Sequence, residues 1–112
     1  MAASQTYLWR HSEALIDTGA SESCIDSALA VALSLPIVGL PQKSSGIGGQ
    51  GIHNVHLAQI YVPSLHFSIY GRFLAVHLSA GGQPYHALSG RTFLLHCSMT
   101  YDVRTGTVVI EK

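Results

Sequence analysis

Short apolar runs alternate with polar and glycine-rich turns along most of this chain of 112 residues. Residues 14–16 form an apolar run that ends at an aspartate, which is typical of a buried strand followed by a turn. Longer β-prone segments cover 52–62, 65–70 and 72–78, and Gly71 between the last two predicts a β-bulge. The pattern therefore predicts a mostly β protein.

Two short helices are expected between these strands. Asp26 and Ser27 are favourable N-cap residues for a helix over 28–33, and Pro36 ends this helical segment. The other predicted elements are a strand at 6–10, a strand that turns into a short helix over 87–96, and a closing hairpin with strands at 99–102 and 107–110.

The composition indicates one domain that has a partner. Residues 1–112 are enough for a single hydrophobic core but not for two. Hydrophobic residues make up 47% of the chain and charged residues only 11%, which leaves little polar surface and favours a partner that covers an apolar face. Six basic and six acidic residues cancel, so no electrostatic field favours nucleic acid or an anionic membrane as a partner.

The cysteines and the apolar segments indicate the cellular compartment in which the protein is expected. Cys24 and Cys97 do not make a disulfide framework, and buried free thiols fit a reducing compartment. Residues 1–12 lack the apolar core of a signal peptide. The most apolar segment, 28–40, is interrupted by serine, proline and glycine and is too short to span a bilayer. We therefore expect a soluble, cytoplasmic protein.

The apolar run at 14–16 leads directly into Asp17, Thr18 and Gly19. A carboxylate beside a buried strand is costly unless it is hydrogen-bonded, paired or protonated. Thr18 offers a hydroxyl group, and Gly19 allows a sharp turn that exposes backbone amides. Asp-Thr-Gly is also ordinary turn chemistry, so its interpretation depends on the rest of the chain.

Residues 46–51 match the pattern G-x-G-x-x-G. A dinucleotide site would need this loop to begin a helix, but β-branched, aromatic and histidine residues follow it. No Lys-Ser/Thr pair completes a P-loop. The remaining interpretations are a structural turn and a mobile hairpin tip that covers a site, and the high glycine content favours the tip.

The histidines and cysteines give no comparable pattern. His53 and His56 are three residues apart, so on one strand they would face opposite sides and could not chelate a metal together. We expect them to be surface or half-buried histidines, and no metal or other cofactor is predicted. The chain contains no G-x-S-x-G elbow, and no local pattern supports Cys24 or Cys97 as a nucleophile.

A second pattern follows at 88–91, Leu-Ser-Gly-Arg, directly before the apolar helix segment Thr-Phe-Leu-Leu. In the order Asp-Thr-Gly, glycine-rich tip, hydrophobic-x-Gly-Arg and closing hairpin, the chain resembles the retropepsin-like single-domain aspartic peptidases from about residue 8 to 110. In that family the Gly-Arg segment precedes a short helix that buttresses the active-site loop, and glycine lets the backbone pass close behind that loop.

The resemblance implies a closed β-barrel, equivalent to half of a pepsin-type fold, with a flap hairpin. It implies a homodimeric aspartic endopeptidase in which Asp17 of each chain contributes to the catalytic dyad and the substrate is an extended polypeptide. The active-site loop would be supported by Thr18, Gly19, Ala20 and Arg91. The flap would contain Gly46, Ile47, Gly48 and Gly49, and the subsites would be lined by Pro84, Tyr85 and Leu88.

Two positions depart from the family pattern. Ser89 stands where a second hydrophobic residue is usual, and Ser21 stands where an aspartate commonly pairs with the arginine, so that Arg91 is expected near Ser21 and Glu22 without a defined partner. An alternative is therefore a dimeric module of the same fold that binds or assembles peptides without turnover. The closing hairpin is the preferred contributor to the dimer sheet.

Overall fold

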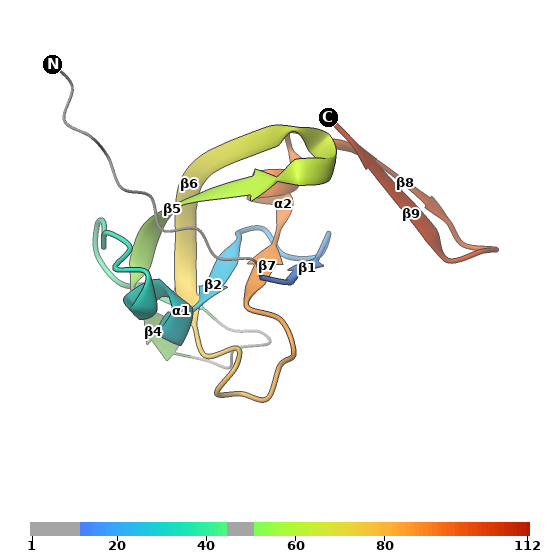
Figure 1. Cartoon of the computed structure of the whole chain (residues 1–112). Helices are drawn as coiled ribbons and strands as arrows, with labels where there is room; N and C mark the ends of the chain where they lie inside the picture. The colour runs from blue at the N-terminus through green and yellow to red at the C-terminus, as the bar shows by residue number, and fades with distance from the viewer. Residues whose placement is uncertain (1–11, 45–50) are drawn as a thin grey trace, which may run out of the picture.

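The computed structural model describes residues 12–44 and 51–112, and it is mostly β (Figure 1). The strands of this part of the chain are β1 Ala14–Ile16, β2 Cys24–Asp26, β3 Gln42–Ser44, β4 Gly51–His53, β5 Val55–Val62, β6 Phe67–Val76, β7 Ala87–Ser89, β8 Ser98–Asp102 and β9 Thr107–Glu111. The helices are α1 Ser27–Ala32, the 3-10 helix η1 Pro63–Leu65 and α2 Arg91–Leu94. The strand predicted at 6–10 lies outside the described residues.

The central sheet has the strand order β1-β7-β2-β6-β5. β7 lies between two strands that are adjacent in sequence, and it runs parallel to β1 and antiparallel to β2. In this register Ile16 is paired with Ser89 at the carboxyl ends of β1 and β7. The loop that begins at Asp17 therefore lies beside the turn from β7 into α2.

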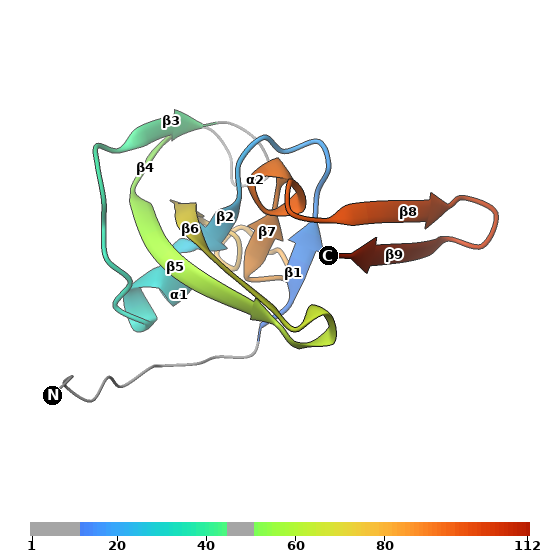
Figure 2. The same cartoon turned by 90° about the horizontal axis from the view of Figure 1, so that it is seen from above.

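β5 and β6 form the longest hairpin of the described chain (Figure 2). Eight residue pairs run without interruption from Val55–Leu74 to Val62–Phe67, and Gly71 lies opposite Ala58 within this ladder. The predicted bulge at Gly71 is therefore wrong, because the glycine is accommodated in a regular register.

The central sheet does not close into a barrel within the described residues, so the prediction of a closed β-barrel is wrong for this part of the chain. The physical reason is that β1 and β5 are the two edges of the sheet and do not pair with each other. Among the described residues, an isolated bridge between Ile37 and His56 is the only β-pairing on the outer side of β5. The pairs β3–β4 and β8–β9 form separate two-stranded sheets.

Two clusters of buried apolar side chains form the core. α1 contributes Leu29 and Ala30 to a cluster that also contains Ile25, Ala58 and Phe73. The second cluster contains Val55, Leu74, Val76 and Leu78. Because both clusters include residues of the central sheet, the sheet is the rigid base on which the Asp17 loop is built.

α1 begins one residue earlier than predicted, and Asp26 occupies its N-cap position without a side-chain cap hydrogen bond. Instead, the carboxylate of Asp26 accepts hydrogen bonds from the backbone N–H of Leu78 at 3.1 Å and from the hydroxyl group of Ser79 at 2.8 Å. The expected cap residue therefore joins the start of α1 to the chain that follows β6.

The closing hairpin β8–β9 agrees with its predicted position and extends away from the rest of the molecule (Figure 1). Nearly all of its side chains are exposed. None of the helices within residues 12–44 and 51–112 has the length and apolar character needed to cross a membrane.

Candidate active site

The Asp17 loop is held by its own backbone and by β7. The backbone N–H of Asp17 donates to the Ser89 carbonyl oxygen at 3.0 Å. The Asp17 carboxylate accepts a hydrogen bond from the backbone N–H of Gly19 at 2.9 Å, and the N–H of Ala20 donates to the Asp17 carbonyl oxygen at 3.3 Å. The side chain of Asp17 is half-buried, so its carboxylate is oriented by the loop and still reaches solvent.

Gly90 passes directly behind this loop. A methyl group at position 90 would overlap the carbonyl oxygen of Glu22 and would lie 2.9 Å from that of Ala20. The backbone of Gly90 has negative φ, so the requirement for glycine comes from space and not from an unusual backbone conformation. The next N–H, of Arg91, donates to the Ala20 carbonyl oxygen at 2.8 Å.

Arg91 also contacts the loop through its side chain. Its guanidinium group donates to the carbonyl oxygen of Thr18 at 3.0 Å. The sequence placed Arg91 near Ser21 and Glu22 without a defined partner, and the structure supplies a backbone carbonyl as that partner. A cation on this carbonyl fixes the residue that directly follows Asp17.

Two hydroxyl residues that the sequence analysis did not identify complete the connection. Ser23 is 2% exposed, and its hydroxyl oxygen accepts a hydrogen bond from the N–H of Gly90 at 3.0 Å. The same hydroxyl group lies 2.8 Å from the hydroxyl group of Thr92. Ser23 and Thr92 are 69 residues apart in sequence, so no local pattern could have paired them, although a small hydroxyl residue at the start of an apolar strand was a weak signal.

Cys24 lies close to the carboxylates of the loop. Burial, together with the negative charges of Glu22 and Asp17, raises the pKa of its thiol to about 11. The thiolate is the nucleophilic form of cysteine, so Cys24 is an inert neutral thiol at neutral pH. This environment disfavours the cysteine nucleophile that the sequence left open at this position.

The predicted subsite residues lie in different environments. Pro84 is exposed in the loop before β7, and Tyr85 is half-buried against the second core cluster. Leu88 is only 5% exposed and is paired with Leu15 of β1 and Cys24 of β2. Leu88 therefore packs within the sheet under the loop, whereas Pro84 and Tyr85 lie on the segment that leads to it.

The predicted flap residues Gly46, Ile47, Gly48 and Gly49 lie outside the described residues. The strands on either side of them, β3 and β4, are antiparallel, with Gln42 paired with His53 and Ser44 with Gly51. The chain therefore enters and leaves the 45–50 segment as the two arms of one hairpin.

The two histidines of this region are more buried than expected, at 8% exposed for His53 and 4% for His56. His56 Nδ1 lies 2.9 Å from the Leu35 carbonyl oxygen, which satisfies one ring nitrogen in the core. Within residues 12–44 and 51–112, no three side chains of His, Cys, Asp or Glu are grouped as metal ligands would be.

Comparisons of the chain with protein-family models, with curated proteins and with solved structures gave no match. The site itself offers one oriented, solvent-accessible carboxylate for each chain, since Asp-Thr-Gly occurs once in the sequence. The carboxylate of Asp26, which is buried, already accepts hydrogen bonds from Leu78 and Ser79. A single carboxylate of this kind can accept a proton or orient a water molecule, and paired with an identical one it can do both.

Proposed function

We propose that this protein is a retropepsin-like aspartic endopeptidase that acts as a homodimer. The observation that carries the proposal is the passage of Gly90 and Arg91 directly behind the Asp17 loop. Gly90 lies against the carbonyl groups of Glu22 and Ala20, and Arg91 donates to Thr18. This is the contact that the resemblance implies between the two most specific motifs of the sequence.

The proposed chemistry needs two Asp17 carboxylates that face each other across a two-fold axis. Two like charges so close together share one proton, so that one carboxyl group is ionised and the other is neutral. The ionised group takes a proton from a water molecule, which attacks the scissile carbonyl carbon. The neutral group donates its proton to the carbonyl oxygen, and the pair then protonates the leaving amine.

The residues around Asp17 and those of the hairpin between β3 and β4 also have roles in this proposal. Thr18 is exposed and would hydrogen-bond across the dimer, while Arg91 holds its backbone carbonyl. The hairpin that begins and ends with β3 and β4 would close over an extended substrate through Ile47 and Gly48. Main-chain hydrogen bonds would then grip the polypeptide in the manner of an added β-strand.

Substitution of Asp17 by asparagine is the first prediction. Asp17→Asn keeps the shape of the side chain and its hydrogen bond from Gly19, but it cannot be ionised. We expect cleavage of an unfolded protein substrate at mildly acid pH to fall by at least about a thousandfold. The measurement is fragment formation by mass spectrometry, with and without a statine inhibitor, alongside sedimentation of the variant to show that the assembly is unchanged.

Glu13→Gln provides the matched control, because it removes an exposed carboxylate just before β1 and should leave cleavage at the wild-type rate. Equal cleavage by wild-type protein and Asp17→Asn would refute the assignment. Binding of unfolded protein without cleavage that depends on Asp17 would instead favour a dimeric peptide-binding or assembly module.

A further inference from the structure

Two histidines from separate elements meet at the base of the β3–β4 hairpin. His53 is the last residue of β4, and His77 directly follows β6. Their rings lie edge to face, with centroids 6.3 Å apart and planes 70° apart. His53 is only 8% exposed, whereas His77 is exposed. We refer to these two residues as the histidine pair.

One nitrogen of the His53 ring is buried without a hydrogen bond. Its Nε2 atom has no partner among residues 12–44 and 51–112, although buried polar atoms are usually bonded. A neutral imidazole carries a proton on only one of its nitrogens, whereas both nitrogens of the protonated ring are donors. A second proton would therefore place a charge and an unpaired N–H group in a buried position, which is costly. The surroundings of His53 favour the neutral ring.

His77 connects the histidine pair to the loop 77–86, which joins β6 to β7 (Figure 1). Its Nδ1 atom lies 2.9 Å from the hydroxyl oxygen of Ser27 at the start of α1. The backbone N–H groups of the two residues that follow His77 both donate to the carboxylate of Asp26. The start of the loop is therefore anchored, and the histidine pair is a contact between this anchored segment and β4.

The surrounding elements carry other titratable side chains, namely Asp26 on β2, Lys43 on β3, His56 and Tyr61 on β5, Tyr70 and Arg72 on β6, and Tyr85 and His86 in the loop 77–86. The carboxylate of Asp26 is already bonded to the chain after β6, and His56 Nδ1 lies 2.9 Å from a backbone carbonyl oxygen. Lys43 pairs with Ile52, so strand alternation places it on the face opposite His53. None of these groups is an acceptor for His53 Nε2.

We propose that the histidine pair is a proton-sensitive joint, which holds β4 against the loop 77–86 at neutral pH and releases β4 below about pH 6. His77 is exposed and can gain a proton while it stays hydrated. His53 can be hydrated as a cation only when β4 moves away, and two protonated rings would repel each other. Because β4 is one arm of the hairpin assigned to substrate binding, its release would weaken that binding in acid. This consequence rests on the proposed function, whereas the response of β4 to pH does not.

The size of the effect follows from the protons that the released form binds and the packed form does not. A histidine in water gains its proton near pH 6.5, so a released His53 is about one tenth protonated at pH 7.5 and about nine tenths protonated at pH 5.5. With the packed ring neutral at both pH values, acid shifts the equilibrium toward release by about tenfold over this interval.

Hydrogen exchange of the full chain tests the joint. We expect the protection of the β4 amides, corrected for the intrinsic exchange rate at each pH, to fall about tenfold from pH 7.5 to pH 5.5. His53→Phe keeps an aromatic ring that cannot be protonated, so its protection should change by less than about twofold. His66→Asn is the matched control and should keep the tenfold change, because His66 is exposed and its φ of 47° suits asparagine.

Wild-type protection of β4 that is equal at both pH values, or a tenfold loss that persists in His53→Phe, would overturn the joint. Where circular dichroism shows that His53→Phe does not fold, an NMR titration of the wild-type imidazole protons decides. A His53 signal that titrates together with the loss of β4 protection supports the joint, and one that titrates without this loss overturns it. A joint that responds as expected in a chain without cleavage that depends on Asp17 would refute the peptidase and leave the joint standing.

Discussion

Gly90 is the residue at which the fold and the candidate site depend on each other most closely. The carbonyl oxygens of Glu22 and Ala20 occupy the space that any larger side chain would need. We expect Gly90→Ala to lower the free energy of unfolding by about 3 kcal/mol, because these backbone groups cannot move aside without shifting the loop. Cleavage activity should fall by more than the loss of folded protein explains, because displacement of the loop also moves Asp17.

Gly71→Ala is a suitable control for Gly90→Ala, because a methyl group at position 71 would have no neighbour within 4 Å. Chemical denaturation of both variants, with protein concentration held constant, measures the difference in stability. Equal stability of the two variants would contradict the close approach of Gly90 to the loop.

At this scale the sequence identifies residues whose importance is local and misses those whose partners are distant. Asp17 and Gly90 belong to short motifs, so they could be selected from the sequence. Ser23 could not, because its hydrogen-bond partners Gly90 and Thr92 lie 67 and 69 residues away. The partner of Arg91 was also out of reach, since a backbone carbonyl has no sequence signal.

Among the elements, the junction between β2, α1 and the end of β6 depends on the charge of Asp26. This side chain is 2% exposed. Burial raises its pKa, but hydrogen bonds from Ser79 and Leu78 outweigh burial and lower the pKa below its ordinary value. A carboxyl group with a lowered pKa in the folded state stabilises the protein above its ordinary pKa of about 4, and this contribution is lost as the pH falls through the folded-state value.

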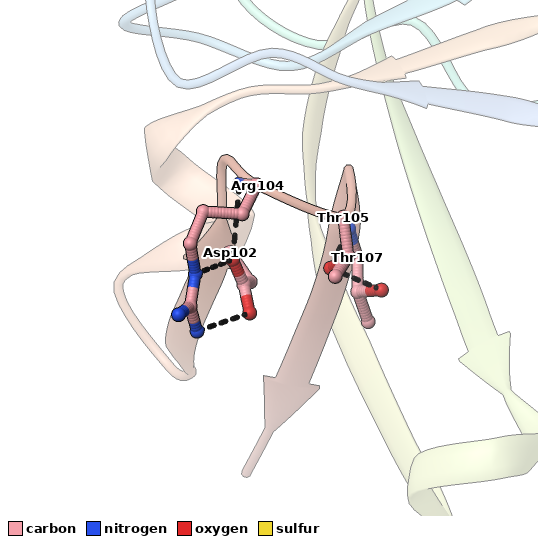
Figure 3. Close-up of polar contacts among 4 residues, drawn as sticks. All are labelled: Asp102, Arg104, Thr105 and Thr107. Atoms are coloured by element: carbon pink, nitrogen blue, oxygen red, sulfur yellow. Dashed lines mark hydrogen bonds and ion pairs between the residues drawn. The ribbon is translucent and has the colours of Figure 1, made fainter.

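Asp26→Asn should therefore destabilise the protein by about 2 kcal/mol at pH 7. The difference between variant and wild type should begin to shrink below about pH 4, where the carboxyl group of the unfolded chain becomes protonated, and should be lost once the pH falls below the lower folded-state pKa. Urea unfolding at several pH values measures this dependence. Asp102→Asn is the control, because Asp102 also has a lowered pKa but ends β8 beside an exposed turn. There it forms a surface ion pair with Arg104 (Figure 3), and its charge has little effect on stability. A constant difference across the pH range would contradict the role assigned to the Asp26 charge.

The elements themselves were predicted well where their pattern is local. The strand before Asp17, the helix after Asp26 and the closing hairpin appear within a residue or two of their expected bounds. The bulge at Gly71 was wrong because a glycine within a strand is compatible with either a bulge or a regular ladder. The choice is made by the partner strand, where Ala58 lies directly opposite.

On the scale of the whole molecule, closure of the sheet and assembly depend on contacts that no local pattern records. The closed barrel was predicted from resemblance alone, and the edges of the observed sheet, β1 and β5, stay apart. The low charge content predicts an apolar face that a partner covers, and this stays a prediction. Within the described residues, β1 is the edge strand of the central sheet on the side from which β8–β9 extends (Figure 2).

Shared catalysis by two chains makes a prediction that no single-chain site can satisfy. If each active dyad needs Asp17 from both chains, random mixing with about a threefold excess of Asp17→Asn chains leaves only about one quarter of the wild-type chains with a wild-type partner. Cleavage per wild-type chain should therefore fall about fourfold after equilibration of the mixture.

Glu13→Gln chains provide the control for this mixing experiment, because they retain Asp17 and should enter the same mixed dimers. The same excess of Glu13→Gln should leave the rate of cleavage per Asp17-bearing chain nearly unchanged. Initial rates of peptide cleavage across a series of mixing ratios distinguish the models, since a shared dyad makes the rate per wild-type chain proportional to the fraction of wild-type chains. A rate per wild-type chain that is independent of added Asp17→Asn would show that each chain acts alone, and it would remove the basis for a dyad built from two copies.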